Sequence, residues 1–278
     1  MTDVLHIYLT ARHAYVRRQA GWPGQAGWPG RAGVEAWPAL EWNALAPATL
    51  DFSALPAAPL RLLRRRRVHV YLGAALYRLM ALDIPAALTD AAEAQLAAMA
   101  MMAHELGIPA AEWRCALDRA PAGGKSVACA MLRSVQQRLQ AHAAQLGWTL
   151  ASVRPLAGVL WNAAQLLPAW RPGAARAMLL VEEDGFAAVA GAGSQVLSVL
   201  ALPYRVDGAA IERELRRLAY AGGPGAAVDV RLGAPDGGRG LAAGQQSLLM
   251  PCGPVSAAGQ PVHYADFRDL FFAAGAAA

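Results

Sequence analysis

The sequence has few of the residues that build metal centres, disulfide frameworks and nucleophilic active sites. Its three cysteines, Cys115, Cys129 and Cys252, form no Cys-x-x-Cys pair and leave one over, which favours a reducing cytoplasm over a disulfide framework. The six histidines are scattered, and neither His-Glu-x-x-His nor a carboxylate pair at ligand spacing occurs. Gly-x-Ser-x-Gly is missing too, so serine hydrolase chemistry is unsupported. We therefore expect no metal site and assign no catalytic residue.

Lysine is almost absent as well. Lys125 is the only one, and the other 24 of the 25 basic residues are arginines. The net charge of +5 equals the contribution of five arginines at positions 61 and 64–67, so the rest of the chain is balanced. A nucleic-acid-binding domain spreads its basic residues over a face or along a helix, so nucleic acid is not an expected partner.

The arginine run itself has three interpretations. It contacts nucleic-acid phosphates, it contacts anionic lipid headgroups, or it is a solvated lead-in to the strand that starts at Val68. Because no aromatic residues are interleaved with the arginines, we favour a solvated segment or a contact for a partner protein, with lipid second. The candidate contact residues are Arg64, Arg65, Arg66 and Arg67.

Neither a secretory signal nor a membrane helix is expected. The start, Met1 to Val4, has no basic segment followed by an apolar core. The longest mostly apolar stretch, residues 185–204, is long enough to span a bilayer, but Gly191 to Gln195 interrupts it, which indicates two strands and a turn. With 56% hydrophobic and 16% charged residues in 278, the chain has enough apolar side chains for one large domain or two lobes. We expect a cytoplasmic protein, peripheral at most to the inner membrane.

Proline, glycine and arginine concentrate between residues 19 and 67. The hexapeptide Gln-Ala-Gly-Trp-Pro-Gly occurs there twice, at 19–24 and 25–30. Because proline and glycine at this density interrupt helices and strand ladders, we expect a loop or flexible insert. On either side of it, His6-Ile-Tyr-Leu9 is echoed by His69-Val-Tyr-Leu72, and both are predicted strands followed by a short break.

After Pro85, predicted helices and strands alternate. Apolar periodicity and capping residues predict helices over about 90–107, 126–146, 155–167 and 208–220. Strands are predicted over 113–117, 149–153, 177–182, 186–190, 195–201 and 228–232. Antiparallel strands followed by alternating helices and strands occur twice, which is typical of two related α/β lobes with mixed sheets. We predict a first lobe over residues 1–170, containing the insert at about 19–67, and a second over 171–278 with an irregular C-terminal tail.

The best candidate for a ligand site in the sequence is the run Gly123, Gly124, Lys125 and Ser126. It follows a predicted strand and opens a predicted helix, which is where a phosphate-binding loop places backbone N–H groups and a lysine around phosphate oxygens. Glu182, at the end of an apolar strand, would supply a magnesium ligand. Against this, Arg119 stands where the full motif needs its first glycine, and the run also fits a simple turn that caps a helix. A P-loop-type enzyme of phosphoryl transfer or NTP hydrolysis is therefore the alternative hypothesis.

Five segments resemble one known family in their order and spacing. They are Val68-His-Val-Tyr-Leu72, Met80-Ala-Leu-Asp-Ile-Pro85, Trp113-Arg-Cys-Ala-Leu-Asp118, Leu146-Gly-Trp-Thr-Leu-Ala-Ser-Val-Arg-Pro155 and Ala177 to Glu182. The family is that of the cytoplasmic domain of the type II secretion L protein, which is related to the type IV pilus M protein. The resemblance implies an α/β fold of the actin-like, ribonuclease H-like class, with two lobes, mixed sheets and flanking helices.

The same resemblance bears on nucleotide binding, because actin-like ATPases hold nucleotide with an Asp-x-Gly hairpin in each lobe. Here the first hairpin, Tyr8 to Arg12, contains neither aspartate nor glycine, and the second, Glu182 to Gly185, has its acid and glycine adjacent. No cofactor is therefore expected, and ATP with magnesium belongs to the alternative hypothesis. The resemblance implies a non-catalytic scaffold, a pseudo-ATPase that binds other subunits of a type IV pilus or type II secretion assembly platform at the cytoplasmic face of the inner membrane.

Overall fold

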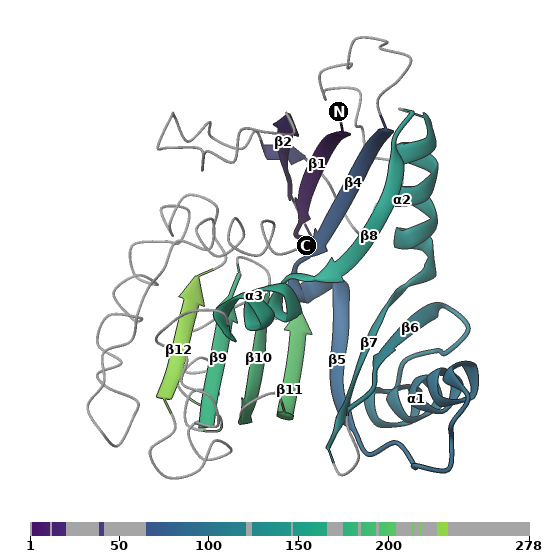
Figure 1. Ribbon diagram of the computed structural model, residues 1–278, viewed down its shortest axis with the longest axis vertical. Coiled ribbons are helices and arrows are strands. Elements are labelled where there is room, and N and C mark those ends of the chain that lie inside the picture. Colours follow the sequence, from purple (N-terminus) through teal and green to yellow (C-terminus); the bar gives the residue numbers. More distant parts are fainter. Residues whose placement is uncertain are drawn as a thin grey trace.

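The computed structural model describes most of the chain between residues 2 and 232. The described residues are 2–11, 13–20, 39–41, 65–120, 124–145, 147–165, 175–182, 185–192, 195–203, 213, 217 and 227–232. They form three β-sheets with flanking helices (Figure 1).

The largest sheet has five strands in the order β3-β2-β1-β4-β8. Its strands are β1 (Thr2–Leu9), β2 (His13–Ala20), β3 (Ala39–Glu41), β4 (Arg65–Leu72) and β8 (Thr149–Pro155). The first three form an antiparallel meander, whereas β4 runs parallel to β1 and β8 runs parallel to β4. The two similar tetrapeptides of the sequence lie side by side and in register, with His6 paired to His69 and Leu9 paired to Leu72.

Residues 19–67 are only partly the irregular insert that the sequence predicts. β2 continues to Ala20, residues 39–41 form β3, and β4 already begins at Arg65. The interpretation of the arginine run as a lead-in to the strand is therefore wrong for residues 65–67, because their backbone pairs with residues 2–4 of β1. Arg64 and the second hexapeptide lie outside the described residues.

A four-stranded sheet, in the order β11-β10-β9-β12, repeats the topology of the first. Its strands are β9 (Ala175–Val181), β10 (Gly185–Ala192), β11 (Gln195–Pro203) and β12 (Ala227–Leu232). Three strands again form an antiparallel meander, and the fourth runs parallel to the first of them. The apolar stretch 185–204 is thus two strands joined by a turn, as predicted. A meander with one parallel strand beside it therefore occurs twice.

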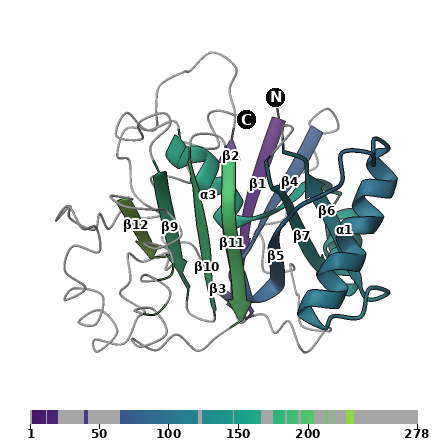
Figure 2. The same ribbon diagram turned by 90° about the horizontal axis from the view of Figure 1, so that it is seen from below.

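A three-stranded antiparallel sheet, β5-β7-β6, stands beside the four-stranded sheet and is covered by α1 (Figure 2). The elements are β5 (Tyr77–Leu82), β6 (Trp113–Asp118), β7 (Ser126–Leu132) and α1 (Ala91–Leu106). The helix predicted over 126–146 is wrong in its first part, since 126–132 form the central strand β7 and α2 begins at Arg133. The sequence Ser-Val-Ala-Cys-Ala-Met-Leu fits both a helical and an alternating pattern. Pairing with two neighbouring strands decides between them.

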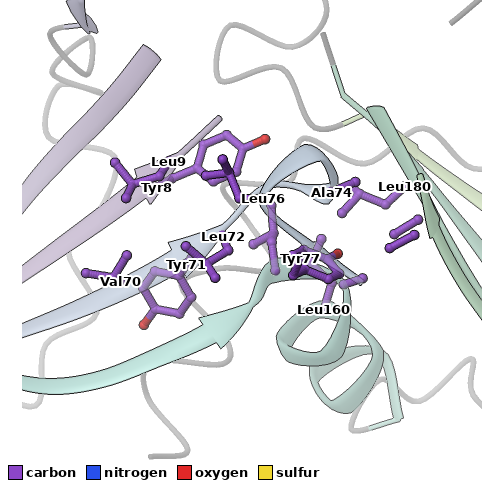
Figure 3. Close-up of a cluster of buried hydrophobic side chains, with 14 of the residues drawn as sticks. Tyr8, Leu9, Val70, Tyr71, Leu72, Ala74, Leu76, Tyr77, Leu160 and Leu180 are labelled. Atoms are coloured by element: carbon purple, nitrogen blue, oxygen red, sulfur yellow. The ribbon is translucent and has the colours of Figure 1, made fainter. Parts of the chain in front are cut away.

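One buried core joins the two larger sheets through α2 (Arg133–Gln145) and α3 (Leu156–Gln165) (Figure 3). Its members come from β1, β4, both helices, β9 and β10. They include Ile7, Leu9, Val70, Leu72, Val135, Leu139, Leu156, Leu160, Met178 and Leu180. None of the described helices combines the length and apolar composition that a membrane crossing requires.

Some predicted elements fall outside the described residues. The helix predicted over 208–220 is described only at Arg213 and Arg217, which are helical. The lobe boundary predicted near residue 170 and the tail after residue 232 are not among the described residues.

The ends of α1 follow the local sequence. Asp90 Oδ1 accepts hydrogen bonds from the backbone N–H of Ala92 at 2.8 Å and of Glu93 at 2.9 Å. Gly107 closes the helix with a φ of +62°, a conformation that favours glycine. Both ends are as the sequence predicts.

Replacing Asp90 by alanine is expected to lower the free energy of unfolding by about 1 kcal/mol, because two N–H groups of the first turn lose their acceptor. Asp90→Asn keeps an oxygen acceptor and should cost much less. Urea denaturation of the two variants measures the difference, and equal losses would contradict a capping role.

Candidate functional site

The two repeated topologies meet at a buried junction between the end of β1, the β4–β5 connection and the end of β9. We call it the Glu182 junction and define it by Tyr8, Gly73, Ala74, Tyr77 and Glu182. Each residue lies at or just beyond the end of a strand, so the sheets themselves fix their positions.

Glu182 is the central group of this junction, and only 1% of it is exposed. Its Oε1 accepts a hydrogen bond from the Tyr8 hydroxyl at 2.5 Å, and its Oε2 accepts one from the backbone N–H of Ala74. Its own N–H donates to the carbonyl of Gly185 at 2.9 Å, which closes the β9–β10 turn. Hydrogen bonds to a charged acceptor are about twice as strong as neutral ones. A carboxylate of the second lobe is therefore held by two donors of the first.

Gly73 allows this close approach. It connects β4 to the 3-10 turn η3 (Ala74–Leu76), and its N–H donates to the carbonyl of Leu9 at 2.6 Å. A Cβ at this position would lie 3.0 Å from the Leu9 oxygen and 3.3 Å from Glu182 Oε1. Its backbone, with φ of −72°, is open to any residue. Lack of space, and not φ, therefore selects glycine here.

The β9–β10 turn packs against η3 with equally little room. A Cβ on Gly185 would lie 2.6 Å from the carbonyl oxygen of Leu202 and 3.2 Å from the Cβ of Ala74. Because the first of these distances is shorter than any real Cβ contact, a larger residue would displace backbone. The turn and η3 are thus in direct contact beside the Glu182 carboxylate.

Tyr77, the first residue of β5, is fully buried next to Leu160 (Figure 3). Within the described part of the chain its hydroxyl has no hydrogen-bond partner. Burial raises the pKa of Tyr77 well above its usual value, and the charges of Glu182 and Cys129 raise it further. The backbone of Ala157 lies close enough to oppose this rise without completing a hydrogen bond. Tyr77 therefore stays neutral and does not act as a base.

The chemistry of the junction disfavours an anionic ligand. The two donors that face the carboxylate, Tyr8 and the N–H of Ala74, are occupied by Glu182 itself. A phosphate group here would have to displace the carboxylate and would meet its negative charge in a buried site, where like charges repel strongly. In the structure both donors are bound to the internal carboxylate.

The residues proposed as a phosphate-binding loop do not form one. Gly123 lies outside the described residues, and Gly124 and Lys125 connect β6 to β7. Ser126 begins an antiparallel strand, so the helix N-terminus that the loop requires is missing there. Lys125 Nζ lies 3.9 Å from Asp83 Oδ2, and both side chains are largely exposed.

Glu182 is also far from Lys125. Glu182 binds Ala74, just before β5, whereas Lys125 pairs with Asp83, just after β5. A strand of this length spans roughly 17–20 Å, so the two groups do not converge on one magnesium ion. The alternative hypothesis of a P-loop enzyme therefore lacks its geometry. No cluster of three or more His, Cys, Asp or Glu side chains suited to a metal ion is present among the residues that the structure describes.

Tyr8, Gly73, Ala74 and Tyr77 are the junction residues that sequence reasoning missed as site residues, and no sequence signal points to Tyr77. The signal that points to the other three is the repeated tetrapeptide, whose two copies both end where a small-residue break begins. The sequence pointed to Glu182 as a magnesium ligand and as the start of the second hairpin, whereas in the structure its carboxylate is a buried acceptor between the lobes.

Comparison with known proteins gives no match by sequence. No protein-family model matches the chain, and no curated protein is similar to it. Comparison with solved structures does find similar proteins.

A chain of the PilM–PilN type IV pilus biogenesis complex has a TM-score of 0.57 at 14% identity, covering 89% of this chain and 86% of that one. A Bacteroides thetaiotaomicron protein with an actin-like ATPase fold and unknown function has a TM-score of 0.54 at 10% identity, covering 90% and 86%.

This chain has the actin-like ATPase fold. The fold class predicted from the sequence is thereby confirmed. The cytoplasmic domain of EpsL, an inner membrane component of the type II secretion system of Vibrio cholerae, is a further neighbour, with a TM-score of 0.48 at 14% identity, covering 83% of this chain and 82% of that one. The two segments that the sequence resemblance compares with nucleotide hairpins begin at Tyr8, near the end of β1, and at Glu182, after β9, and the Tyr8 hydroxyl donates a hydrogen bond to the Glu182 carboxylate.

Replacing Glu182 by alanine is expected to lower the free energy of unfolding by about 3 kcal/mol, because the Tyr8 hydroxyl and the Ala74 N–H lose a charged acceptor inside the protein. Tyr8→Phe should cost about 1.5–3 kcal/mol. The double variant should cost less than the sum of the two, with a coupling energy of about 1.5 kcal/mol.

Urea denaturation of the four proteins measures this cycle. Glu105→Ala, an exposed carboxylate of α1, is the control and should change stability by less than about 0.5 kcal/mol. A coupling energy near zero would show that Tyr8 and Glu182 do not interact in solution.

Proposed function

We propose that the protein is a non-catalytic actin-like scaffold. It would bind other protein subunits of a type IV pilus or type II secretion-like assembly platform at the cytoplasmic face of the inner membrane. The observation that carries the non-catalytic part is the Glu182 carboxylate, which occupies both the Tyr8 hydroxyl and the Ala74 N–H between the two hairpins. Because the Glu182 carboxylate occupies these two donors, they are not available to a nucleotide phosphate.

The link between the lobes supports a scaffold role. In this chain, the Glu182 hydrogen bonds and one shared apolar core connect the two larger sheets. An interface held by internal contacts keeps its geometry whether or not a small molecule is present. Such a protein is suited to present a constant surface to its partners.

The assembly part of the proposal rests on the fold and on the sequence resemblance together. One structural neighbour is a chain of a type IV pilus biogenesis complex, and it is similar over 89% of this chain. The segments from Val68 to Glu182 resemble the type II secretion L protein family. Because one fold serves many functions, the partner itself has to be tested directly.

Magnesium ATP is expected to leave the melting temperature unchanged. A ligand present at 100 times its Kd stabilises the folded state by about 2.7 kcal/mol, which for a chain of this size raises the melting temperature by roughly 5–10 °C. Differential scanning fluorimetry resolves such a change. A rise of this size would overturn the non-catalytic proposal, and Lys125→Ala would show whether the lysine loop carries the binding.

Cross-linking and affinity purification of the full chain from the cells that encode it test the assembly role. We expect a membrane-anchored subunit of a pilus or secretion machine to be recovered and identified by mass spectrometry, and to be missing from cells that express the tag alone. Recovery of the chain without any such subunit would contradict the proposal.

A further inference from the structure

One face of the five-stranded sheet carries polar side chains of β4 and β8 that take no part in the Glu182 junction. On β4, Arg67, His69 and Tyr71 alternate onto the same face. On β8, Ser152 pairs with His69 and Arg154 pairs with Tyr71, so both belong to that face too. The opposite face, with Val68, Val70 and Leu72, packs into the core, and Tyr71 of the polar face is buried at its edge. We call the polar set, together with His6 on β1, the Arg67–Arg154 face.

The centre of this face is ordered by its own contacts. His69 Nδ1 lies 2.8 Å from the Ser152 hydroxyl oxygen. The ring of His6 stacks on that of His69, with centroids 5.6 Å apart, and its Nδ1 lies 3.1 Å from the Tyr71 hydroxyl. His69 is therefore held in one orientation between the two arginines.

The charge on this face is positive and unbalanced. Arg67 and Arg154 are exposed, and no ion pair of either is present in the described part of the chain. By strand alternation, Val4, His6 and Tyr8 of β1 share this face with Arg67, His69 and Tyr71 of β4, and none of these six residues is acidic.

The surroundings of His69 affect its protonation. Its pKa is lowered, first by burial and then by the positive charges of Arg154 and Arg67. Both guanidinium groups therefore act on the same imidazole, which places it within the field of each. An anion bound between them would reverse the electrostatic part of this shift.

We propose that Arg67, His69, Ser152 and Arg154 form a binding site for a phosphate-type oxyanion. Two unpaired guanidinium groups carry a charge of +2, which matches the charge of about −1.5 to −2 on a phosphate monoester at neutral pH. Guanidinium groups bind phosphate oxygens in a bidentate manner. When His69 is protonated, its Nδ1–H donates to Ser152, which leaves the Ser152 hydroxyl and the His69 Nε2–H to donate to the remaining oxygens. A single carboxylate would neutralise only one of the two arginines.

This site is independent of the Glu182 junction and of the proposed scaffold role. The phosphate chemistry has two sources, an anionic phospholipid headgroup or a soluble phosphorylated molecule. Either source would place a ligand on the sheet face at β4 and β8, where the sequence pointed only to the arginine run.

Inorganic phosphate is the first probe. In a phosphate-free buffer at neutral pH, its addition to the full chain is expected to shift the imidazole NMR signals of His69 in a saturable manner, and to raise the pKa of His69, since a bound anion stabilises the imidazolium. Arg67→Gln combined with Arg154→Gln should weaken this binding at least tenfold. Arg114→Gln, which replaces an exposed arginine of strand β6, is the matched control and should leave it unchanged.

Binding to lipid vesicles distinguishes a phospholipid headgroup from a soluble phosphorylated ligand. Co-sedimentation with phosphatidylcholine vesicles that contain phosphatidic acid, lost in the double variant and not seen with phosphatidylcholine alone, supports the site with a lipid headgroup as its ligand. Phosphate binding without co-sedimentation supports the site with a soluble ligand. Thermal melting of each variant confirms that it is folded.

Two results would overturn the proposal. One is the lack of any effect of phosphate on His69 together with the lack of co-sedimentation. The other is binding of polyglutamate, but of neither phosphate nor vesicles, because that would assign the face to an acidic polypeptide.

Discussion

The hydrogen bonds that Tyr8 and the N–H of Ala74 donate to the Glu182 carboxylate are the interaction on which the arrangement of the two lobes depends. A buried carboxylate is costly unless its oxygens are satisfied, so the lobes must stay close enough for both donors to reach it. Gly73 and Gly185 make that distance possible, because a side chain at either position would meet backbone or the carboxylate itself. The close approach that Gly73 and Gly185 allow thus both stabilises the junction and leaves no room for a side chain at either position.

The same interaction accounts for how the two repeated sheets of this chain are connected. The fold contains two repeated sheets, and contacts between the ends of their hairpins are needed to fix one sheet relative to the other. In this chain, a side chain of the second sheet supplies the negative charge, and the apolar core shared by β1, β4, β9 and β10 supplies the rest of the contact. A binding surface formed by both sheets would require such a constant orientation of one sheet relative to the other.

Local signals in the sequence predicted what local chemistry determines. The ends of α1 at Asp90 and Gly107, the hairpin within 185–204 and the duplicated strand order all follow from capping, turn residues and alternation. The sequence predictions were wrong or incomplete where contacts with residues distant in the sequence determine the structure. Residues 126–132 are alanine-rich and ambiguous alone, and their pairing with β5 and β6 makes them a strand. The role of Glu182 depends on residues 174 and 108 positions away, which no local pattern reveals.

The in-register pairing of His6-Ile-Tyr-Leu9 with His69-Val-Tyr-Leu72 has a consequence for folding. Two strands that end in nearly identical tetrapeptides offer the chain two candidates for the centre of the same sheet. Loop closure distinguishes them, because β1 reaches β2 across a short turn, while β4 joins only after more than fifty residues have been looped out. The order of closure, and not the side chains of the tetrapeptides, therefore determines which copy pairs with β2 and which forms the parallel neighbour.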